Sequence, residues 1–233
     1  NAIQPYGVKN TRSLLINRRT LICNVTLDNQ NWQAFRPLLE SFLSALPTSQ
    51  PQLSNFDIQP SIRREGLSIP AQVNYVGKGA NLYDLGYEYD GSDEVINGYL
   101  RMAYLWEKIR VQGGAYGAFS VFDDASGVFT FLSYRDPNVA KTLENYDQAA
   151  AFLKGLDASR LNDNELTKAI IGTIRNFDAY QLPDAKGYTS MLRELTGRSD
   201  EHRQEVREQV LSTNGEDFIA FGEVLEKVAQ SNA

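Results

Sequence analysis

Apolar residues recur with two different periods along this chain, and each change of period predicts a helix or a strand. β-Branched and aliphatic residues crowd Leu14–Ile16 and Thr20–Leu27, on either side of polar residues 17–19, which predicts two strands around a tight turn. Asp28 is a predicted N-cap, because apolar residues recur every three or four positions over Asn29–Leu46. That spacing indicates an amphipathic helix.

The next segment predicts a loop, a strand and a second helix. Prolines and polar residues over Pro47–Pro60 are typical of a loop, and we extend that loop to residues 47–70. Ala71–Val76 is a predicted strand that ends in a turn over Gly77–Ala80, where the spacing of a phosphate-binding loop is absent. Ser92 is the predicted N-cap of a helix. Its expected buried stripe consists of Val95, Tyr99, Met102, Trp106 and Ile109.

A hairpin and a helical tail follow. Ala118–Phe122 and Val128–Tyr134 alternate as paired strands do, with Gly127 closing the loop between them. Asp136 followed by proline predicts the start of a helix that Gly155 stops. Further helices are predicted over Asn164–Phe177, Asp184–Thr196 and Ser199–Leu211, and a last one from Thr213, with a capping box to Glu216 and a core stripe of Phe218, Phe221 and Leu225.

This order of elements predicts an α+β fold. A hairpin requires antiparallel pairing, and helices fill the C-terminal third, so we expect one antiparallel or mixed β-sheet with helices packed mainly on one face. We expect residues 3–233 to form a single domain. Asn1 and Ala2 are compatible with the remnant of an engineered cleavage site and are set aside.

Composition excludes two classes of partner. The formal net charge of −6 argues against a protein that binds nucleic acid without sequence preference, because such proteins cluster Lys and Arg. The sequence contains no apolar run near the ~20 residues of a membrane-spanning helix. We therefore expect a soluble chain with neither nucleic acid nor membrane as a partner.

The numbers of histidines and cysteines limit which catalytic and metal sites this chain can form. His202 is the single histidine and lies in a run of charged residues, so we expect it to be an ordinary surface residue. A Ser-His-Asp triad would have to use it, and a zinc site of two or three histidines cannot be built, so we predict no metal site in this chain. Cys23 is the single cysteine, which excludes an internal disulfide. Because Cys23 lies in an apolar run, we expect it to be a small core residue.

Arg110 and Tyr116 are the candidate functional pair, on either side of Gly113 and Gly114. Both have ordinary explanations, since a cation is favoured in the last turn of a helix and a tyrosine that opens a strand usually packs its ring. Glycines are costly there unless the backbone bends sharply or approaches a ligand closely. A guanidinium and a phenol on such a turn can hydrogen-bond a peptide carbonyl and its developing oxyanion.

Several long motifs of this chain resemble those of one protein family and occur in the same order along the sequence. They are LW at residues 105–106 with RVQGGAYG at 110–117, FLSYRDPN at 131–138, KAIIGTI at 168–174, YQLPDAKG at 180–187 and AQVNYVGKG at 71–79. They are similar to the C-terminal part of presequence proteases, in the pitrilysin/insulinase group of zinc metallopeptidases. The resemblance spans roughly Thr20–Leu225.

The resemblance implies a pitrilysin/LuxS-like domain and a shared active site. In that family the inverted zinc motif H-x-x-E-H lies in the N-terminal half, which would be this chain's partner and would hold the zinc. The C-terminal half supplies an arginine and a tyrosine, which match Arg110 and Tyr116, and we extend the substrate-binding set to Gly113, Gly114 and Ala115. The family motif itself is absent here.

Two functions follow as hypotheses. In the first, the chain is the C-terminal domain of a zinc endopeptidase that degrades short unstructured peptides and is inactive alone. In the second, it belongs to a non-catalytic structural or chaperone-like subunit of the same fold. The resemblance implies a cytoplasmic location if the source is bacterial, and an organelle matrix or stroma if it is eukaryotic.

Overall fold

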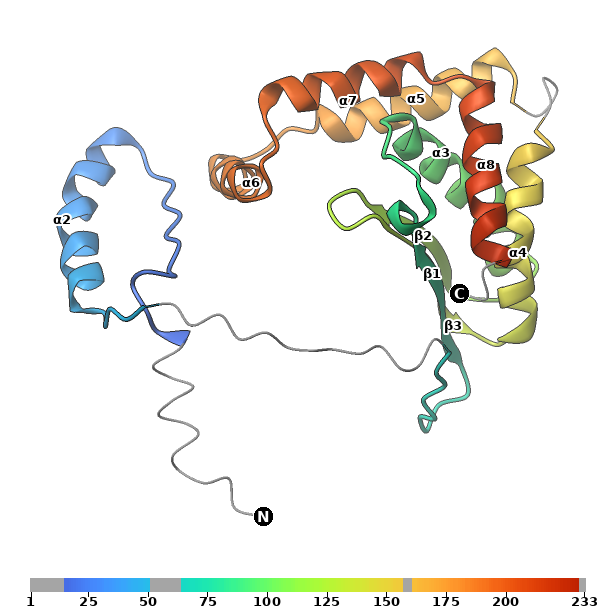
Figure 1. Ribbon diagram of the computed structural model, residues 1–233, viewed down its shortest axis with the longest axis horizontal. Helices are drawn as coiled ribbons and strands as arrows, with labels where there is room; N and C mark the ends of the chain where they lie inside the picture. The colour runs from blue at the N-terminus through green and yellow to red at the C-terminus, as the bar shows by residue number, and fades with distance from the viewer. Residues whose placement is uncertain (1–14, 51–63, 157–160, 231–233) are drawn as a thin grey trace. The chain divides into compact units, whose positions relative to one another are not determined.

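The computed structural model describes residues 15–50, 64–156 and 161–230, and the chain divides into two compact units (Figure 1). The first unit combines Asn1–Ser61 with Gln181–Leu195, and the second combines Ile62–Tyr180 with Thr196–Ala233. A single domain over residues 3–233 stays a prediction. Within the described ranges, no helix is both long enough and apolar enough to cross a membrane.

The first unit contains helix α2 (Asn29–Ala45) and helix α6 (Pro183–Thr196). The predicted start of α2 is confirmed, since the Asp28 carboxylate accepts a hydrogen bond from the Asn31 N–H at 2.9 Å. The turn at residues 17–20 is also confirmed, with the Thr20 N–H donating to the Asn17 carbonyl at 3.1 Å.

The strands predicted in the first unit are wrong. Residues 21–28 have no regular secondary structure, the described residues of Leu14–Ile16 form no strand, and Leu14 lies outside the described residues. A strand requires a neighbour for its backbone groups, and β-propensity alone does not provide one. Cys23 is consequently exposed rather than part of a core. Of the predicted loop, residues 47–50 lack regular structure and 51–63 lie outside the described residues.

The second unit is built on a three-stranded antiparallel sheet in the order β1-β3-β2. Its strands are β1 (Asn74–Asn81), β2 (Gly117–Asp123) and β3 (Val128–Asp136), so the predicted hairpin is confirmed. The turn predicted over Gly77–Ala80 is wrong, because these residues pair with β3. A Cβ on Gly79 would lie 2.6 Å from the Phe129 carbonyl oxygen, so this glycine permits close approach of the two strands.

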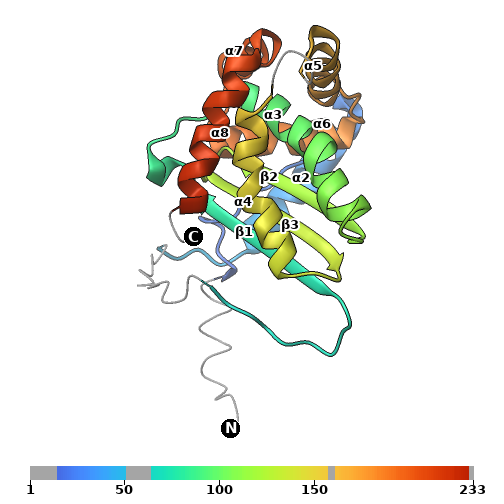
Figure 2. The ribbon, with the colours of Figure 1, turned by 90° about the vertical axis from the view of Figure 1, so that its right-hand side faces the viewer.

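Helices of the second unit cover one face of the sheet, which confirms the α+β prediction (Figure 2). They are α3 (Ser92–Leu100), the π-helix η2 (Arg101–Val111), α4 (Ala140–Lys154) and α8 (Gly215–Gln230). Helices α5 (Asp163–Phe177) and α7 (Asp200–Ser212) pack against α3, and a short 3₁₀ helix, η1, spans Tyr83–Leu85. The buried core between sheet and helices includes Phe122, Phe129, Phe131, Leu105, Ile109, Tyr146, Leu153, Phe218 and Phe221.

The predicted stripe of the α3–η2 helix is partly wrong. Val95 and Ile109 are buried as predicted, but Met102 is 64% exposed and Trp106 is 41% exposed. The backbone changes at Arg101 from α-helix to π-helix, whose hydrogen bonds run from residue i to i+5. A sequence stripe drawn with the α-helical period therefore leaves the buried face, which instead carries Val95, Ile96, Leu100, Tyr104, Leu105 and Ile109.

Three predicted helix starts are displaced. Gly91, not Ser92, precedes α3, and the Asp90 carboxylate accepts the Ser92 N–H at 2.8 Å. Asp136 ends β3, and α4 begins only at Ala140. Helix α8 begins at Gly215, with its capping box one residue later than predicted, between Asn214 and Asp217. The remaining predicted helices, the Gly155 stop and the buried stripe of α8 are confirmed.

Asp93 is a buried carboxyl in the first turn of α3. It accepts hydrogen bonds from the Tyr87 hydroxyl at 2.5 Å and from the Asp90 N–H at 3.0 Å. Burial raises the pKa of Asp93 to about 7, because the charged form loses its hydration. The folded state therefore holds a proton on Asp93 in a pH range where the unfolded chain has released it.

We expect this proton to make stability fall as the pH rises. Between about pH 4 and 7, the folded state binds more protons at Asp93 than the unfolded state, so the free energy of unfolding decreases by up to about 1.4 kcal/mol per pH unit. Asp93→Asn, measured by urea unfolding at several pH values, should flatten this slope. Exposed Asp84→Asn is the control and should preserve it; an unchanged slope in Asp93→Asn contradicts the prediction.

Candidate functional site

Arg110 lies in the last turn of η2, the helix that leads into the glycine turn. The helix end is tied back by the Gln112 N–H, which donates to the Glu107 carbonyl at 3.0 Å. π-Helical turns are rare and often mark functional positions. The π geometry also turns Trp106 out of the core, to the surface beside Arg110.

The glycine turn ends this helix by a recognisable mechanism. The Gly114 N–H donates to the Arg110 carbonyl at 3.0 Å, and the Ala115 N–H donates to the Ile109 carbonyl at 3.1 Å. Gly114 adopts φ +80°, the left-handed conformation that favours glycine. A Cβ on Gly113 would lie 2.5 Å from the Ile109 carbonyl oxygen, so this position also requires glycine.

These contacts limit what the turn can offer a peptide. The N–H groups of Gly114 and Ala115 are already bonded, and the Asn138 side-chain amide donates to the Gly113 carbonyl at 2.7 Å. The Ala115 side chain is buried. A substrate-binding role for Gly113, Gly114 and Ala115 stays a prediction, and their evident role is to set the direction in which the chain leaves the helix.

The Arg110 guanidinium lies close to two aromatic rings. Its central carbon is 3.9 Å from the centroid of the Trp106 ring and 6.0 Å from that of Tyr116. Both separations are in the range of cation–π attraction. Within the described part of the chain, Arg110 makes neither an ion pair nor a hydrogen bond through its side chain. The stack therefore positions the guanidinium and leaves its N–H donors available to a ligand.

Tyr116 begins the connection to β2 and is fixed by its backbone and its ring. Its N–H donates to the Tyr134 carbonyl at 3.1 Å and to the Arg135 carbonyl at 3.4 Å. The Tyr116 ring meets the Tyr134 ring edge-on, with centroids 5.7 Å apart. The side chain is 66% exposed, and its hydroxyl bonds to none of the described residues. The hydroxyl is thus presented to solvent on a fixed ring.

The structure therefore brings the predicted pair together and adds neighbours that the sequence did not single out. Trp106 contacts Arg110, Tyr134 contacts Tyr116, and Arg135 lies over Tyr134. Trp106 is four residues before Arg110, a spacing that places side chains on one helical face, and this signal was available in the sequence. Tyr134 and Arg135 become neighbours only through pairing of the two hairpin strands.

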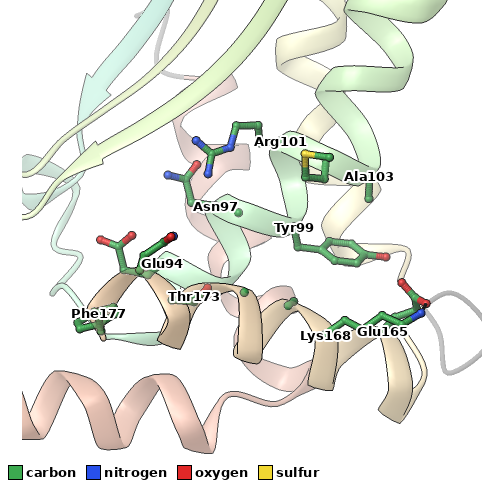
Figure 3. A pocket seen from close by; sticks show the side chains of 14 residues that line it. Glu94, Asn97, Tyr99, Arg101, Ala103, Glu165, Lys168, Thr173 and Phe177 are labelled. Atoms are coloured by element: carbon green, nitrogen blue, oxygen red, sulfur yellow. Dashed lines mark hydrogen bonds and ion pairs between the residues drawn. The ribbon is translucent and has the colours of Figure 1, made fainter. Parts of the chain in front are cut away.

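A groove of about 530 Å³ lies elsewhere in the second unit, between α5 and the α3–η2 helix (Figure 3). Glu94, Asn97 and Arg101 lie on one wall, and burial raises the pKa of Glu94. The Tyr89 hydroxyl donates to Glu94 at 3.3 Å, and Lys168 pairs with Glu165 at 2.8 Å. The residues that line the groove include none of the predicted site residues, and we assign no chemistry to it.

The described residues do not form a zinc site. Across residues 15–50, 64–156 and 161–230, no group of three or more His, Cys, Asp and Glu side chains is placed to hold a metal ion. His202 is exposed on α7, as predicted, with its Nδ1 atom 3.8 Å from the Glu205 carboxylate.

Comparisons with known proteins assign the family. Residues 64–233 match the model of the PreP C-terminal domain. Presequence protease 1, chloroplastic/mitochondrial, of Arabidopsis thaliana is 46% identical over 95% of this chain and 20% of its own length. The mitochondrial presequence protease of Emericella nidulans is 30% identical over 92% of this chain and 20% of its own.

The match covers only part of those relatives, because the chain spans about a fifth of their length. A protease from Helicobacter pylori superposes with a TM-score of 0.46 at 16% identity, over 85% of this chain and 49% of that one, a likeness too low to carry weight. The family match covers most of the second unit, including the hairpin and the glycine turn. The chain therefore belongs to the PreP C-terminal domain family.

Proposed function

We propose that this chain supplies an arginine and a tyrosine to the active site of a zinc endopeptidase that degrades short unstructured peptides. The supporting observation is the position of the Arg110 guanidinium over the Trp106 ring and near the Tyr116 ring, with its donors free of partners among the described residues. Membership of a family whose relatives are named presequence proteases supports the same reaction class.

In this proposal Arg110 binds a carbonyl oxygen of the peptide. A guanidinium offers several N–H donors in one plane, and hydrogen bonds from a charged donor are shorter and stronger than neutral ones. Stacking on Trp106 restricts the side chain before the peptide arrives, which lowers the entropy lost on binding. Arg110 therefore orients the peptide backbone next to Tyr116.

Tyr116 stabilises the charge that develops on the attacked carbonyl oxygen. Its hydroxyl is exposed, while its ring is held by Tyr134 and its N–H by the end of β3. A donor held in advance stabilises an oxyanion without reorganising during the reaction. The hydroxyl can donate to the oxygen in the tetrahedral state, and the Arg110 cation beside it strengthens the same field.

The zinc belongs to a partner segment in this proposal. The described residues supply no set of ligands for it, so we assign the H-x-x-E-H motif and the metal to the N-terminal half of the parent protein. When bound there, zinc would supply a Lewis acid and an activated water. The name of the Arabidopsis relative supports an organelle location if the parent protein is eukaryotic. If the parent protein is bacterial, we propose a cytoplasmic location.

Removing the Tyr116 hydroxyl should slow catalysis rather than weaken binding. In the full-length protein, Tyr116→Phe should lower kcat by about tenfold or more with little change in KM, as expected for loss of an oxyanion donor. Steady-state cleavage of an unstructured peptide measures both constants. Tyr180→Phe removes another exposed hydroxyl and is the control. Equal kcat values for Tyr116→Phe and wild type would contradict the role.

The stack of Trp106 on Arg110 should be measurable as a coupling energy. A double-mutant cycle of Trp106→Leu and Arg110→Leu, followed by urea unfolding, should give about 0.5–1 kcal/mol, the usual value for an exposed cation–π pair. The control cycle combines Trp106→Leu with Lys108→Leu, two residues along the helix and off that face. Coupling no larger than in the control would show that the indole does not hold the guanidinium.

The 233-residue chain alone should not cleave peptides in a zinc-dependent manner. Its described residues form no metal site, and the proposal places the ligands in another part of the protein. A quenched-fluorescence peptide incubated with the chain and added zinc should release no product above the buffer rate. Cleavage that a chelator abolishes would refute this division of the active site.

A further inference from the structure

Arg135 has an unusual backbone conformation at the end of β3. Its φ is +49°, and among the described residues it is the only non-glycine residue with a positive φ. Left-handed backbone costs most L-residues roughly 1–2 kcal/mol and is adopted more readily by glycine and asparagine. An arginine here lowers stability relative to those residues, so its side chain requires an explanation.

The neighbouring residues hold Arg135 in this conformation. Its carbonyl accepts the Tyr116 N–H at 3.4 Å, which ties it to the start of β2. The next residue, Asp136, is fully buried and accepts the Asn138 N–H at 2.8 Å and the Thr142 hydroxyl at 2.7 Å. The register shifts here, since Asn74 pairs with Asp136 but Val76 pairs with Ser133, so a β-bulge accounts for the backbone conformation and leaves the choice of arginine to be explained.

The Arg135 side chain faces solvent with its donors uncommitted. It is exposed, and its guanidinium carbon lies 5.5 Å from the centroid of the Tyr134 ring. No described residue forms a hydrogen bond or an ion pair with the guanidinium. The structural contacts of the side chain are therefore limited to the face of one ring, which does not account for a strained arginine.

A chain of rings connects Arg135 to the proposed site. Tyr134 contacts Tyr116, and Tyr116 lies beside Arg110, so two guanidinium groups flank one pair of tyrosines. The adjacent Asp136 carboxylate is buried, accepts the Asn138 N–H and the Thr142 hydroxyl, and forms an ion pair with neither guanidinium. In a chain with a net charge of −6, this surface is locally cationic and offers fork-shaped donors, which match carboxylates.

We propose that Arg135 is a further peptide-binding residue, whose guanidinium pairs with a carboxylate of the bound peptide, on an acidic side chain or at the C-terminus. The inference rests on the proposed function, in which Arg110 and Tyr116 hold the peptide backbone beside it. Arg135 then determines preference among peptides, and the strained backbone directs its side chain to the shared surface.

The test combines stability with the specificity of cleavage, in the full-length protein. Arg135→Asn and Arg135→Gly suit the left-handed backbone, so thermal midpoints should stay equal to wild type or rise. A structural role for the side chain would lower them instead. Three peptides of one sequence distinguish the ligand: one with a free C-terminal carboxylate, one amidated, and one amidated with a single internal glutamate.

Both variants should raise KM about tenfold for peptides whose carboxylate binds Arg135, the effect of losing one charge-assisted hydrogen bond. The amidated peptide without glutamate should keep its KM, and kcat should change by less than about twofold for all three. A rise in KM confined to the peptide with a free C-terminus identifies the C-terminal carboxylate as the ligand. A rise in KM confined to the glutamate peptide identifies an acidic side chain as the ligand. A charge-matched control, exposed Arg175→Gln on α5, should leave all three KM values unchanged.

Three results would overturn the inference. They are unchanged KM values for all three peptides, an equal rise for all three, and a fall in thermal midpoint that accompanies the loss of binding. Failure of the proposed function gives a different pattern, in which Arg110→Leu and Tyr116→Phe leave cleavage unaffected. If Arg135 variants change KM selectively while those two variants do not affect cleavage, the further inference holds and the proposed function fails.

Discussion

Antiparallel pairing of β3 with both neighbouring strands is the interaction on which the second unit depends. Phe129 and Phe131 of β3 reach the core on one face, while Tyr134 lies on the other face near the strand end. The register opposes Gly117 and Tyr134, which places the preceding Tyr116 against the end of β3. A slip of one residue would turn the phenylalanines to solvent and separate the two tyrosines, so one constraint specifies both the core and the site.

The cations near that site are held differently from the ion-paired cations elsewhere in the unit. Arg207 pairs with Asp178 at 2.7 Å, as surface arginines commonly do. Arg110 and Arg135 instead lie over aromatic rings. A carboxylate partner would occupy the N–H donors and cancel the charge, whereas Trp106 restrains the guanidinium from its face and leaves its edge free. The arrangement is suited to a ligand that supplies the missing oxygen atoms.

Local signals account for the parts of the fold that could be predicted. The N-cap at Asp28, the hairpin and helix α5 depend on residues close in sequence, and all three are confirmed. The strand predicted over Thr20–Leu27 depends on a partner strand elsewhere in the chain, which residue pattern does not specify, and Cys23 is exposed as a result. The strand prediction thus failed because it depended on long-range pairing.

The candidate site likewise contains residues that the sequence identified and residues that it did not. Arg110 and Tyr116 could be found because glycines interrupt a helix between them, and those glycines prove to end the helix. Trp106 was placed in the core because an α-helical period was assumed through a segment that is π-helical. Arg135 gave no signal, since backbone strain becomes visible only in three dimensions. Positioning residues follow from backbone geometry, so sequence reasoning recovers the reactive groups of a site before it recovers what holds them in place.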